Sequence, residues 1–346
     1  MKRGVGLGRG TVYNNIVGDS YEHVNPENKA LLKEWKMYLY STDKAETTID
    51  KYDYDFKIWC VWNYKNNKDK LFVDITKRDV INFQGYCVNL GHSPSRIRSL
   101  RSCISSLSNY IEAILDDDYP DFRNIVNKIE APKLKTVREK LVLKSEEVES
   151  LLAVLVEREK FQQACYLALA GYSGARKSEL LRFKVEYFTE DNVENGLYKT
   201  SEKIKTKGRG KTGKPLYKWT LKSKFDPYLN LWMQEREKLG IDSEWLFVRK
   251  NEGEYVKAKI TTADSWAETI SIHLGQSFYA HSQRHFYVTE LVRAGIPATI
   301  IKDIVGWKTE SLISLYNDGE SSDEFGKYFG EEGIIKQEKK SISDLT

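Results

Sequence analysis

The sequence has few of the residues that hold metal ions or disulfide frameworks. Its 346 residues include four cysteines and five histidines. No two cysteines form a C-x-x-C pair, and no cysteine lies beside a histidine at metal-ligand spacing, which disfavours a zinc site and a disulfide framework. Such a chain is typical of a reducing compartment, and we expect a cytoplasmic protein.

Long hydrophobic runs and a dominant charge of one sign are also missing. No apolar run approaches the ~18 residues of a membrane-spanning helix, and the opening segment MKRGVGLGRG lacks the apolar core of a signal peptide. The chain has 54 Lys and Arg against 50 Asp and Glu, a net charge of +4. A membrane partner is therefore not expected, and a nucleic-acid partner would depend on where the positive charges lie.

The first third of the chain shows helical periodicity. Residues 1–27 are rich in Gly and Asn without a periodic pattern, which indicates a flexible arm. Over 28–128, apolar residues recur three and four positions apart, the spacing of amphipathic helices, and predict a small helical domain. The four apolar stripes are Leu31, Leu32, Trp35, Tyr38 and Leu39; Ile49, Tyr52, Phe56 and Trp59; Val80, Phe83, Cys87 and Leu90; and Ile97, Leu100, Ile104, Leu107, Ile111 and Leu115.

A second domain is expected after a basic linker over 129–144, where Pro132 and scattered Lys and Arg interrupt the periodicity. The next helix is predicted to have Ser145 as its N-cap, with two glutamates in its first turn. This domain, 145–330, should mix helices with a β region near 197–222, and a tail follows at 331–346. The predicted helices cover 145–157, 159–172, 226–238, 262–274, 281–294, 297–304 and 309–316.

Positive charge is densest in 199–224, KTSEKIKTKGRGKTGKPLYKWTLKSK, which has ten Lys or Arg and one acid. The alternation of Lys203, Lys205 and Lys207 predicts a strand, GRGKTG predicts a turn, and KPLYKWTL predicts the return strand. A solvated edge hairpin is one interpretation, because lysine guards exposed sheet edges. The other is a polyanion partner, DNA or RNA, which would relieve the repulsion among these cations.

Two motifs carry residue types suited to phosphate chemistry. In GYSGARKSELLRF, Arg176 stands at a loop–helix junction, and arginine can bind a phosphate through two parallel hydrogen bonds. In HSQRHFYVTELVRAG, His281 and Arg284 share a helix face, and a histidine can transfer a proton near neutral pH. Each motif alone also fits an ordinary polar helix turn.

The stretch GWKTESLISLYND places Tyr316 at the end of a predicted helix. Leu312, Ile313 and Leu315 would bury one side of that helix, and acidic polar residues follow the tyrosine. A phenol with a pKa near ~10 is a poor nucleophile unless cations stabilise its anion. The arginines and the lysine-rich hairpin could supply those cations.

Taken together, SGARKSELL, HSQRH and IVGWKTESLISLY resemble the tyrosine recombinase (phage integrase) family. The 23 residues from Arg284 to Trp307 and the nine from Trp307 to Tyr316 match that family's spacing. The resemblance covers about 145–330, and the first domain looks like the family's more variable core-binding domain. It implies a mainly α fold with a small β-sheet, in which a helical, SAM-like core-binding domain and an α+β catalytic domain form a C-shaped clamp around DNA.

The resemblance also implies an activity, the site-specific cleavage and rejoining of duplex DNA through a covalent 3′-phosphotyrosine without metal or ATP. Tyr316 would be the nucleophile. Arg176 and Arg284 would hold the non-bridging phosphate oxygens, His281 would assist proton transfer, and Trp307 would contact the phosphate region.

Three further assignments complete the implied site. Glu179 would brace the arginines, and Lys211, in GKTGK, would protonate the leaving oxygen, with Lys207 as the alternative. Positively charged residues of the fourth helix and of the hairpin would contact DNA, although the helix set also fits a solvated face. They are Arg96, Arg98, Arg101, Lys203, Lys205, Lys207, Arg209 and Lys214.

The expected partners are double-stranded DNA with a specific recombination site, accessory DNA-bending proteins, and further copies of the chain in a homotetramer on two DNA sites. Such a protein would be associated with the nucleoid. The tail, with Phe325, Tyr328 and Phe329, would dock on a neighbouring protomer. The alternatives are a type IB topoisomerase or telomere resolvase with the same chemistry, and a catalytically silent DNA-binding regulator.

Overall fold

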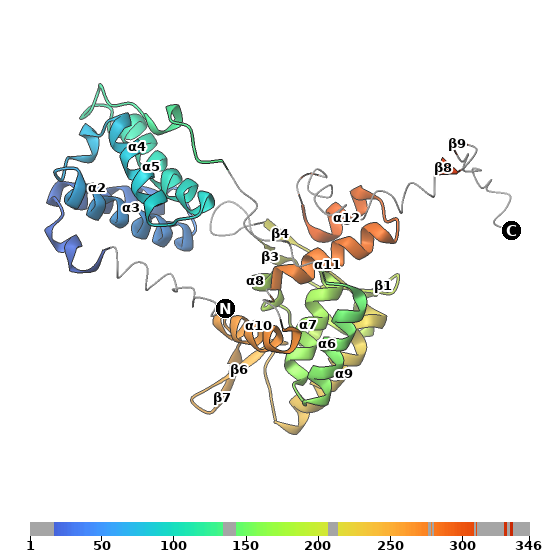
Figure 1. Ribbon diagram of the computed structural model, residues 1–346. Helices are drawn as coiled ribbons and strands as arrows, with labels where there is room; N and C mark the ends of the chain where they lie inside the picture. The colour runs from blue at the N-terminus through green and yellow to red at the C-terminus, as the bar shows by residue number, and fades with distance from the viewer. Residues whose placement is uncertain are drawn as a thin grey trace. The chain divides into compact units, whose positions relative to one another are not determined.

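The protein consists of two compact units that meet along the chain between Glu139 and Lys140 (Figure 1). Each unit has its own hydrophobic core. No helix of the described residues is both long and apolar enough to cross a bilayer. The computed structural model describes residues 17–133, 143–206, 214–275, 278, 280–307, 309, 329–330 and 333–334.

The first unit is built from helices, as the four apolar stripes predict. Its α-helices are α2 (Pro26–Ser41), α3 (Glu46–Asn66), α4 (Lys77–Asn89) and α5 (Pro94–Ile114), and its short 3₁₀ helices are η1 (Gly18–His23), η2 (Phe72–Asp74) and η3 (Val126–Lys128). Polar caps fix the helix starts: the Asn25 side chain accepts from the Glu27 N–H, and Thr76 and Asp79 form a capping box. The core is aromatic, with Trp59 in edge contact with Phe72 and Phe83.

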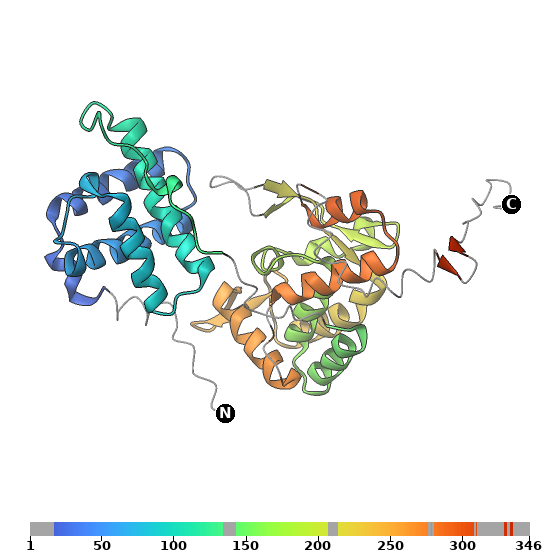
Figure 2. The same cartoon turned by 45° about the horizontal axis from the view of Figure 1, so that its top comes forward.

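The second unit surrounds one helix with others. Helix α7 (Phe161–Ser173) is buried from Ala164 to Ser173 and packs against α6, α9 and α11 (Figures 1 and 2). A helix that is apolar on every side is expected at the centre of a domain. The other helices are α6 (Ser145–Glu157), α8 (Lys177–Leu180), α9 (Lys222–Lys238), α10 (Ile260–Leu274), α11 (Ala280–Arg293) and α12 (Ala298–Val305), with η4 (Val185–Tyr187) and η5 (Glu190–Asn192).

The strands of the second unit are short and antiparallel. They form a three-stranded sheet in the order β1-β2-β5 and three two-stranded pairs, β3-β4, β6-β7 and β8-β9. Their bounds are β1 (Val193–Glu194), β2 (Leu197–Lys199), β3 (Ile204–Thr206), β4 (Lys214–Leu216), β5 (Trp219–Leu221), β6 (Val248–Asn251), β7 (Glu254–Lys257), β8 (Phe329–Gly330) and β9 (Gly333–Ile334). The fold class inferred from the sequence, mainly α with a small β-sheet, is confirmed.

The predicted return strand of the lysine hairpin is divided in two. Leu216 pairs with Ile204 of β3, whereas Trp219 pairs with Lys199 of β2. Tyr217 and Lys218 lie at the step between the two sheets. The chain therefore changes partner strand at Lys218.

The N-cap of helix α6 differs from its prediction by one residue. Lys144 is the N-cap of α6, and its N–H donates to the Glu147 carboxylate at 2.8 Å. Ser145 is the first helical residue, and its hydroxyl donates to Glu290 of α11 at 3.0 Å. The serine therefore fastens α6 to α11 instead of capping its own helix. The predicted helix over 309–316 lies outside the described residues, apart from residue 309.

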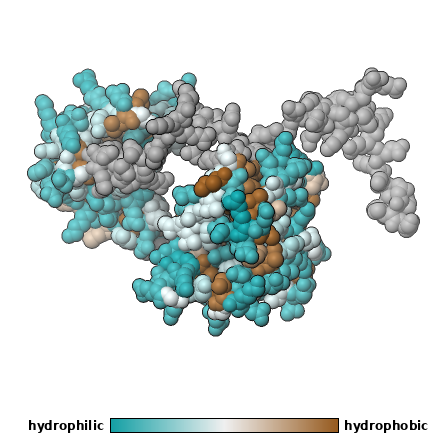
Figure 3. Space-filling view, turned by 60° about the horizontal axis from the view of Figure 1, so that its bottom comes forward, coloured by the Kyte–Doolittle hydropathy of each residue, from teal (hydrophilic) through white to brown (hydrophobic). Residues whose placement is uncertain are grey.

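The face of the protein that Figure 3 draws is largely hydrophilic. In the face drawn in Figure 3, teal residues dominate both units and the brown apolar residues form small groups. All four cysteines are buried, and none forms a disulfide. Small groups of exposed apolar residues are normal for a folded chain, because apolar atoms always contribute part of a protein surface.

Candidate active site

The turn between α7 and α8 positions Arg176. Gly174 ends α7 in the left-handed region, at φ +59°, and a Cβ there would lie 2.4 Å from Cδ1 of Tyr287 on α11. Only glycine satisfies both conditions, since it has no Cβ to collide or to disfavour a positive φ. The turn therefore packs directly on α11 and leaves Arg176 as the N-cap of α8.

Glu179 holds Arg176 in place from the first turn of α8. One carboxylate oxygen, Oε2, accepts from the Arg176 backbone N–H at 3.0 Å, and the other, Oε1, accepts from Arg176 Nη1 at 2.8 Å. The Glu179 side chain is 0% exposed, whereas the guanidinium of Arg176 keeps partial contact with solvent. Charge-assisted hydrogen bonds of this kind fix both the turn and the direction of the arginine.

Arg284 connects three motifs that are distant in the sequence. Its Nη1 donates to the Gly174 carbonyl at 2.8 Å, and its Nη2 donates to the Val305 carbonyl at 3.1 Å. Its guanidinium carbon lies 5.4 Å from the ring centre of Trp307, within cation–π range. The side chain is almost fully buried. This arginine therefore joins the Arg176 turn to the end of α12.

Gly306 and Trp307 close the same region from α12. Gly306 has φ +77°, and a Cβ on it would lie 2.6 Å from Cδ1 of Leu216 on β4, beside which the helix ends (Figure 2). Trp307 is buried in a small cluster with Tyr287, Val305 and their neighbours. The Gly-Trp pair therefore meets the hairpin on one side and α11 on the other.

Lys218 is a fourth charged residue of this cluster and was not singled out from the sequence. Its side chain is 1% exposed, and its Nζ lies 2.9 Å from Glu179 Oε2. The Nζ is also 3.9 Å from the position that a Cβ on Gly306 would take. Lys218 belongs to the basic segment 199–224, for which the sequence left a solvated hairpin and a polyanion-binding hairpin open, and the structure buries it.

The alternation around Lys218 is the reverse of the usual pattern. Lys218 and Thr220 are buried, whereas Tyr217 is 40% exposed, with Lys199 and Lys203 over its ring. A half-buried strand normally turns its aromatic residues inward. Lys218 and Thr220 share a polar strand face, and that shared face was the one sequence signal that could have identified the buried lysine.

Glu179 and Lys218 each shift the pKa of the other. Burial alone would raise the pKa of Glu179, but the charge of Lys218 and the hydrogen bonds from Lys218 and Arg176 hold that pKa below its ordinary value. Burial lowers the pKa of Lys218, Glu179 opposes this change, and the nearby charges of Arg284 and Arg176 add to the lowering. Three cations and one carboxylate leave this cluster with a charge of +2 when all four groups are ionised.

Several residues assigned from the sequence lie outside the described part of the chain. They are Tyr316, Lys211, Lys207 and Arg209. His281 is the second residue of α11, three positions before Arg284, and its side chain is also outside the described part. Lys203, Lys205 and Lys214 are exposed residues of the β3–β4 hairpin and its approach.

The three arginines expected on a phosphate-contacting or solvated face of α5 have different surroundings. Arg96 forms an ion pair with Asp55 at 2.6 Å, and Arg98 Nε donates to the Pro132 carbonyl at 2.8 Å. Arg101 is buried, and its guanidinium donates to Gln84 and to the backbone carbonyls of 126, 129 and 130. The prediction of a phosphate-contacting or solvated face was therefore wrong for Arg101, because its donors hold η3 and the residues after it on α5.

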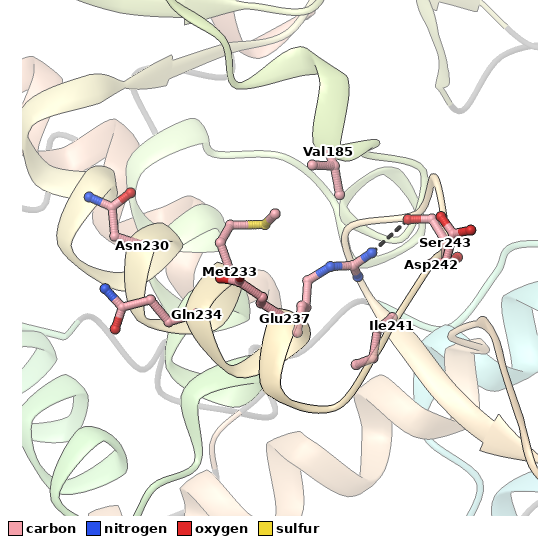
Figure 4. A pocket seen from close by; sticks show the side chains of 9 residues that line it. Val185, Asn230, Met233, Gln234, Glu237, Ile241, Asp242 and Ser243 are labelled. Carbon is pink, nitrogen blue, oxygen red and sulfur yellow. Dashed lines mark hydrogen bonds between the residues drawn. The ribbon is translucent and has the colours of Figure 1, made fainter.

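A cavity of about 620 Å³ lies elsewhere in the second unit (Figure 4). It is lined by the second half of α9 and by residues 241–243, and Arg236 donates to the Ser243 carbonyl at its edge. None of its lining residues belongs to the Arg176–Arg284 cluster. Among the described residues, no group of His, Cys, Asp or Glu is arranged to hold a metal ion.

The cluster suits an anion with charge on several oxygens. Arginine offers a planar array of donors that matches phosphate, and a buried position strengthens each interaction. The backbone carbonyls on Arg284 and the carboxylate on Arg176 fix both guanidinium groups before any ligand arrives. Such preorganised positive charge can stabilise a phosphorane at which negative charge develops.

Comparison with known proteins identifies the family. The model of the phage integrase family matches residues 141–322, which is more than half of the chain. The chain therefore belongs to the phage integrase family.

Individual relatives and solved structures agree with this membership. The chain is 29% identical over 281 residues to the SPbeta prophage-derived recombinase-like protein YomM of Bacillus subtilis (strain 168), covering 80% of this chain and 82% of that protein. It is also similar in fold to the XerH site-specific recombinase bound to a palindromic difH substrate, with a TM-score of 0.63, 18% identity and coverage of 81% and 79%. A lambda integrase(75-356) dimer bound to a COC' core site has a TM-score of 0.60, 16% identity and coverage of 90% and 99%.

Proposed function

We propose that this chain is a site-specific DNA recombinase that cleaves and rejoins duplex DNA through a covalent 3′-phosphotyrosine formed by Tyr316. The observation that carries the proposal is the bonding of Arg284. Its two hydrogen bonds, to Gly174 and Val305, bring the SGAR, HSQR and Gly-Trp motifs to one place. Arg176 lies at that place with its guanidinium held by Glu179.

The reaction balances without a metal ion or ATP. The Tyr316 oxygen attacks the scissile phosphorus, the tyrosyl O–P bond forms, and the P–O5′ bond breaks. The free 5′ hydroxyl of another strand then attacks the phosphotyrosine and releases the phenol. The number of phosphoester bonds is unchanged, so no external energy source is required.

Each remaining residue has a defined task in this scheme. Arg176 and Arg284 neutralise the non-bridging oxygens of the phosphorane. His281 assists proton transfer, the Trp307 indole N–H contacts the phosphate region, and Lys211 or Lys207 protonates the departing 5′ oxygen.

The proposed substrate is duplex DNA in a paired assembly. Exposed lysines of the hairpin, together with Arg96 and Arg98, would contact the phosphate backbone, and the two units would close on the duplex as a C-shaped clamp. Four copies on two DNA sites would exchange strands, with DNA-bending proteins as accessories, in the nucleoid. Deletion of 324–346 should leave binding to a single site intact and weaken the pairing of two sites. Unchanged recombination by the truncated chain would contradict this role of the tail.

A nicked duplex tests the cleavage chemistry. The wild-type chain first selects binding sites from a randomised duplex library, and selected sites are then prepared with a nick that lets the released 5′ fragment diffuse away. We expect a covalent protein–DNA band in a denaturing gel for the wild type and for Tyr255→Phe, a matched change in β7. Tyr316→Phe should give no band.

The other outcomes separate the alternatives. A persistent band with Tyr316→Phe would move the nucleophile to another residue. A wild-type chain that binds but forms no band would support a silent DNA-binding regulator. Cleavage and religation of one duplex without strand exchange between two duplexes would support a type IB topoisomerase or telomere resolvase.

A further inference from the structure

The Glu179–Lys218 ion pair lies where the proposed reaction needs positive charge. Both side chains are fully buried, and among the described residues Arg176 and Arg284 are the other charged groups that act on Lys218. Lys218 belongs to neither the motif of Arg176 nor that of Arg284, because it lies in the two-residue segment between β4 and β5. The cluster therefore contains a cation that the sequence motifs do not include.

Stability does not account for this pair. Removing two charges from water costs several kcal/mol per ion, and well-packed apolar side chains in place of a buried ion pair are often neutral or stabilising. Lys218 is buried at the step between the two sheets, beside Glu179 and the end of α12 at Gly306. Because an apolar side chain at this position would avoid the desolvation cost, function explains the charge better than stability does.

The backbone around Lys218 fixes the position of its ammonium group. The Lys218 N–H donates to the Thr200 hydroxyl at 3.1 Å, and the Thr200 N–H donates to the Lys218 carbonyl at 3.0 Å. Its Nζ then meets Glu179 Oε2, the same oxygen that accepts from the Arg176 backbone. Lys218 and Arg176 therefore hold one carboxylate from two sides.

Glu179 alone would weaken the site that it organises. Its carboxylate fixes Arg176, but its negative charge also offsets one of the two arginines. With Lys218 in place, the charge of the cluster is +2, and without Lys218 it is +1. A phosphorane with two negative charges is stabilised most by the first arrangement, because Coulomb interactions in a buried site are poorly screened.

We propose that Lys218 is a positioning residue that acts as the internal counter-ion of Glu179, so that Glu179 can fix Arg176 without cancelling the positive charge offered to the scissile phosphate. This role rests on the proposed function. Lys218 itself touches neither the phosphate nor the leaving oxygen, because its Nζ is buried against Glu179.

The test compares single and paired substitutions that change the charge in steps. The variants are Lys218→Met, Glu179→Gln, the double variant K218M/E179Q, and Lys218→Arg as the conservative change. Lys224→Met is the matched control, because Lys224 is an exposed residue in the first turn of α9 with a 3.5 Å surface contact to Glu149. Each variant is measured on the nicked duplex selected by the wild type, at a temperature well below its unfolding midpoint.

Two quantities are measured in single turnover, the cleavage rate at saturating DNA and the DNA concentration that gives half of that rate. We expect Lys218→Met to lower the saturating rate about 100-fold, on the scale of losing one preorganised transition-state contact. The half-saturating concentration should change less than about threefold, because most DNA affinity comes from other phosphate contacts. Lys218→Arg should retain most of the rate, and Lys224→Met all of it.

The double variant separates a charge effect from simple loss of a side chain. K218M/E179Q restores the charge of +2, and the single amide oxygen of glutamine can accept one of the two hydrogen bonds that Arg176 donates to Glu179. We expect its saturating rate to exceed that of Lys218→Met by about tenfold, on the scale of one charge-assisted interaction. A double variant no faster than Lys218→Met would overturn the counter-ion role.

A modified leaving group distinguishes positioning from proton donation. In a duplex with a 5′-bridging phosphorothiolate, the departing thiolate needs no proton. We expect Lys218→Met to stay slow on this substrate, since its defect is in charge at the phosphate. Recovery of Lys218→Met to the wild-type rate would make Lys218 an acid and would contradict the proposal.

The possible failures are distinct. If Lys218→Met lowers the unfolding temperature but cleaves at the wild-type saturating rate, the pair is structural and this inference is overturned while the proposed function stands. If the wild type forms no covalent band on any selected duplex, the proposed function is overturned and the role of Lys218 with it.

Discussion

Each unit of the protein contains a buried carboxylate held by two cations, and the two arrangements differ in the burial and in the number of the cations. In the first unit, Asp55 is bound by Lys51 and Arg96, whose side chains are 44% and 29% exposed. In the second unit, Glu179 is bound by Arg176, which is partly exposed, and by Lys218, which is buried. A third cation, Arg284, lies near the second pair but has no equivalent beside Asp55 among the described residues.

We interpret the ion pairs of Asp55 as structural and the surroundings of Glu179 as a charged site. Asp55 joins α3 to the start of α5, and its cations remain hydrated on their outer sides. Among the described residues around Glu179, the buried cations Lys218 and Arg284 outnumber the carboxylate, and burying them carries a desolvation cost. A polyanionic ligand is the simplest partner for that excess, which agrees with membership of the phage integrase family.

One buried arginine in each unit tests whether the charged site differs from the structural contacts. The largest expected effect is on the cleavage rate. Arg284→Lys should lower the cleavage rate by about 1000-fold or more, because lysine cannot reproduce a planar group anchored on two carbonyls. Arg101→Lys in the first unit should lower stability and leave the cleavage rate of the folded protein within about threefold. The measurements are single-turnover cleavage and urea unfolding. Equal losses of rate in the two variants would remove the distinction between the units.

Substitution of one lysine beside each buried carboxylate compares how much the ion pairs of Glu179 and of Asp55 contribute to the free energy of unfolding. At neutral pH, Lys218→Met should cost about 3 kcal/mol of unfolding free energy, because it leaves Glu179 buried with one partner fewer. Lys51→Met should cost less than about 1 kcal/mol, because its ammonium is largely hydrated. Urea unfolding of both variants measures the difference, and a larger loss for Lys51→Met would reverse it.

The loss in Lys218→Met should depend on pH. In the wild type the pKa of Glu179 is below its ordinary value of 4.5, so its contribution to stability is present above that pH and is lost as the pH falls through the folded pKa. In the variant, burial is less opposed and the pKa of Glu179 rises. Protonation then costs the variant less than the wild type, and the stability gap should shrink as the pH falls below 4.5. A gap that stays constant down to the acid transition would contradict the ion pair as its cause.

Two glycines test how closely the site is packed. Gly174→Ala should destabilise the protein by about 3 kcal/mol, because it combines a positive φ with a collision against Tyr287. Gly91→Ala in the first unit, with φ +75° and nothing within 4 Å of the new Cβ, should cost about 1 kcal/mol. Thermal unfolding measures both. A smaller loss for Gly174→Ala than for Gly91→Ala would show that the turn can move away from α11.

The smallest effect is expected from exposed cations. Lys205→Ala on the hairpin should weaken DNA binding about threefold and lower the slope of log affinity against log salt by about one. Arg98→Ala should change that slope less, because the Arg98 Nε already donates a hydrogen bond to the Pro132 carbonyl. Binding titrations at several salt concentrations measure the slopes. A larger slope change for Arg98→Ala would assign the stronger phosphate contact to α5.

Local sequence pattern was sufficient to predict most helices of the described residues. The apolar stripes of the first unit correspond to α2 to α5, and the helix predicted over 145–157 is α6. The positions of Arg176 at a helix start and of Glu179 in its first turn were also readable, since capping is a short-range interaction. These features depend on residues within about one helical turn of each other, and the sequence contains that information directly.

The sequence by itself thus determined the helices α2 to α5 and the order of Arg176, His281, Arg284, Trp307 and Tyr316 along the chain. The tertiary structure decided how Arg284 is held, that Arg101 is an internal fastener, and that Lys218 is buried beside Glu179. The physical reason is that a lysine in a basic strand has the same local sequence pattern whether its face meets water or a carboxylate. Glu179 lies 39 residues before Lys218 in the chain, so only folding brings the carboxylate to the lysine and decides which environment its ammonium has.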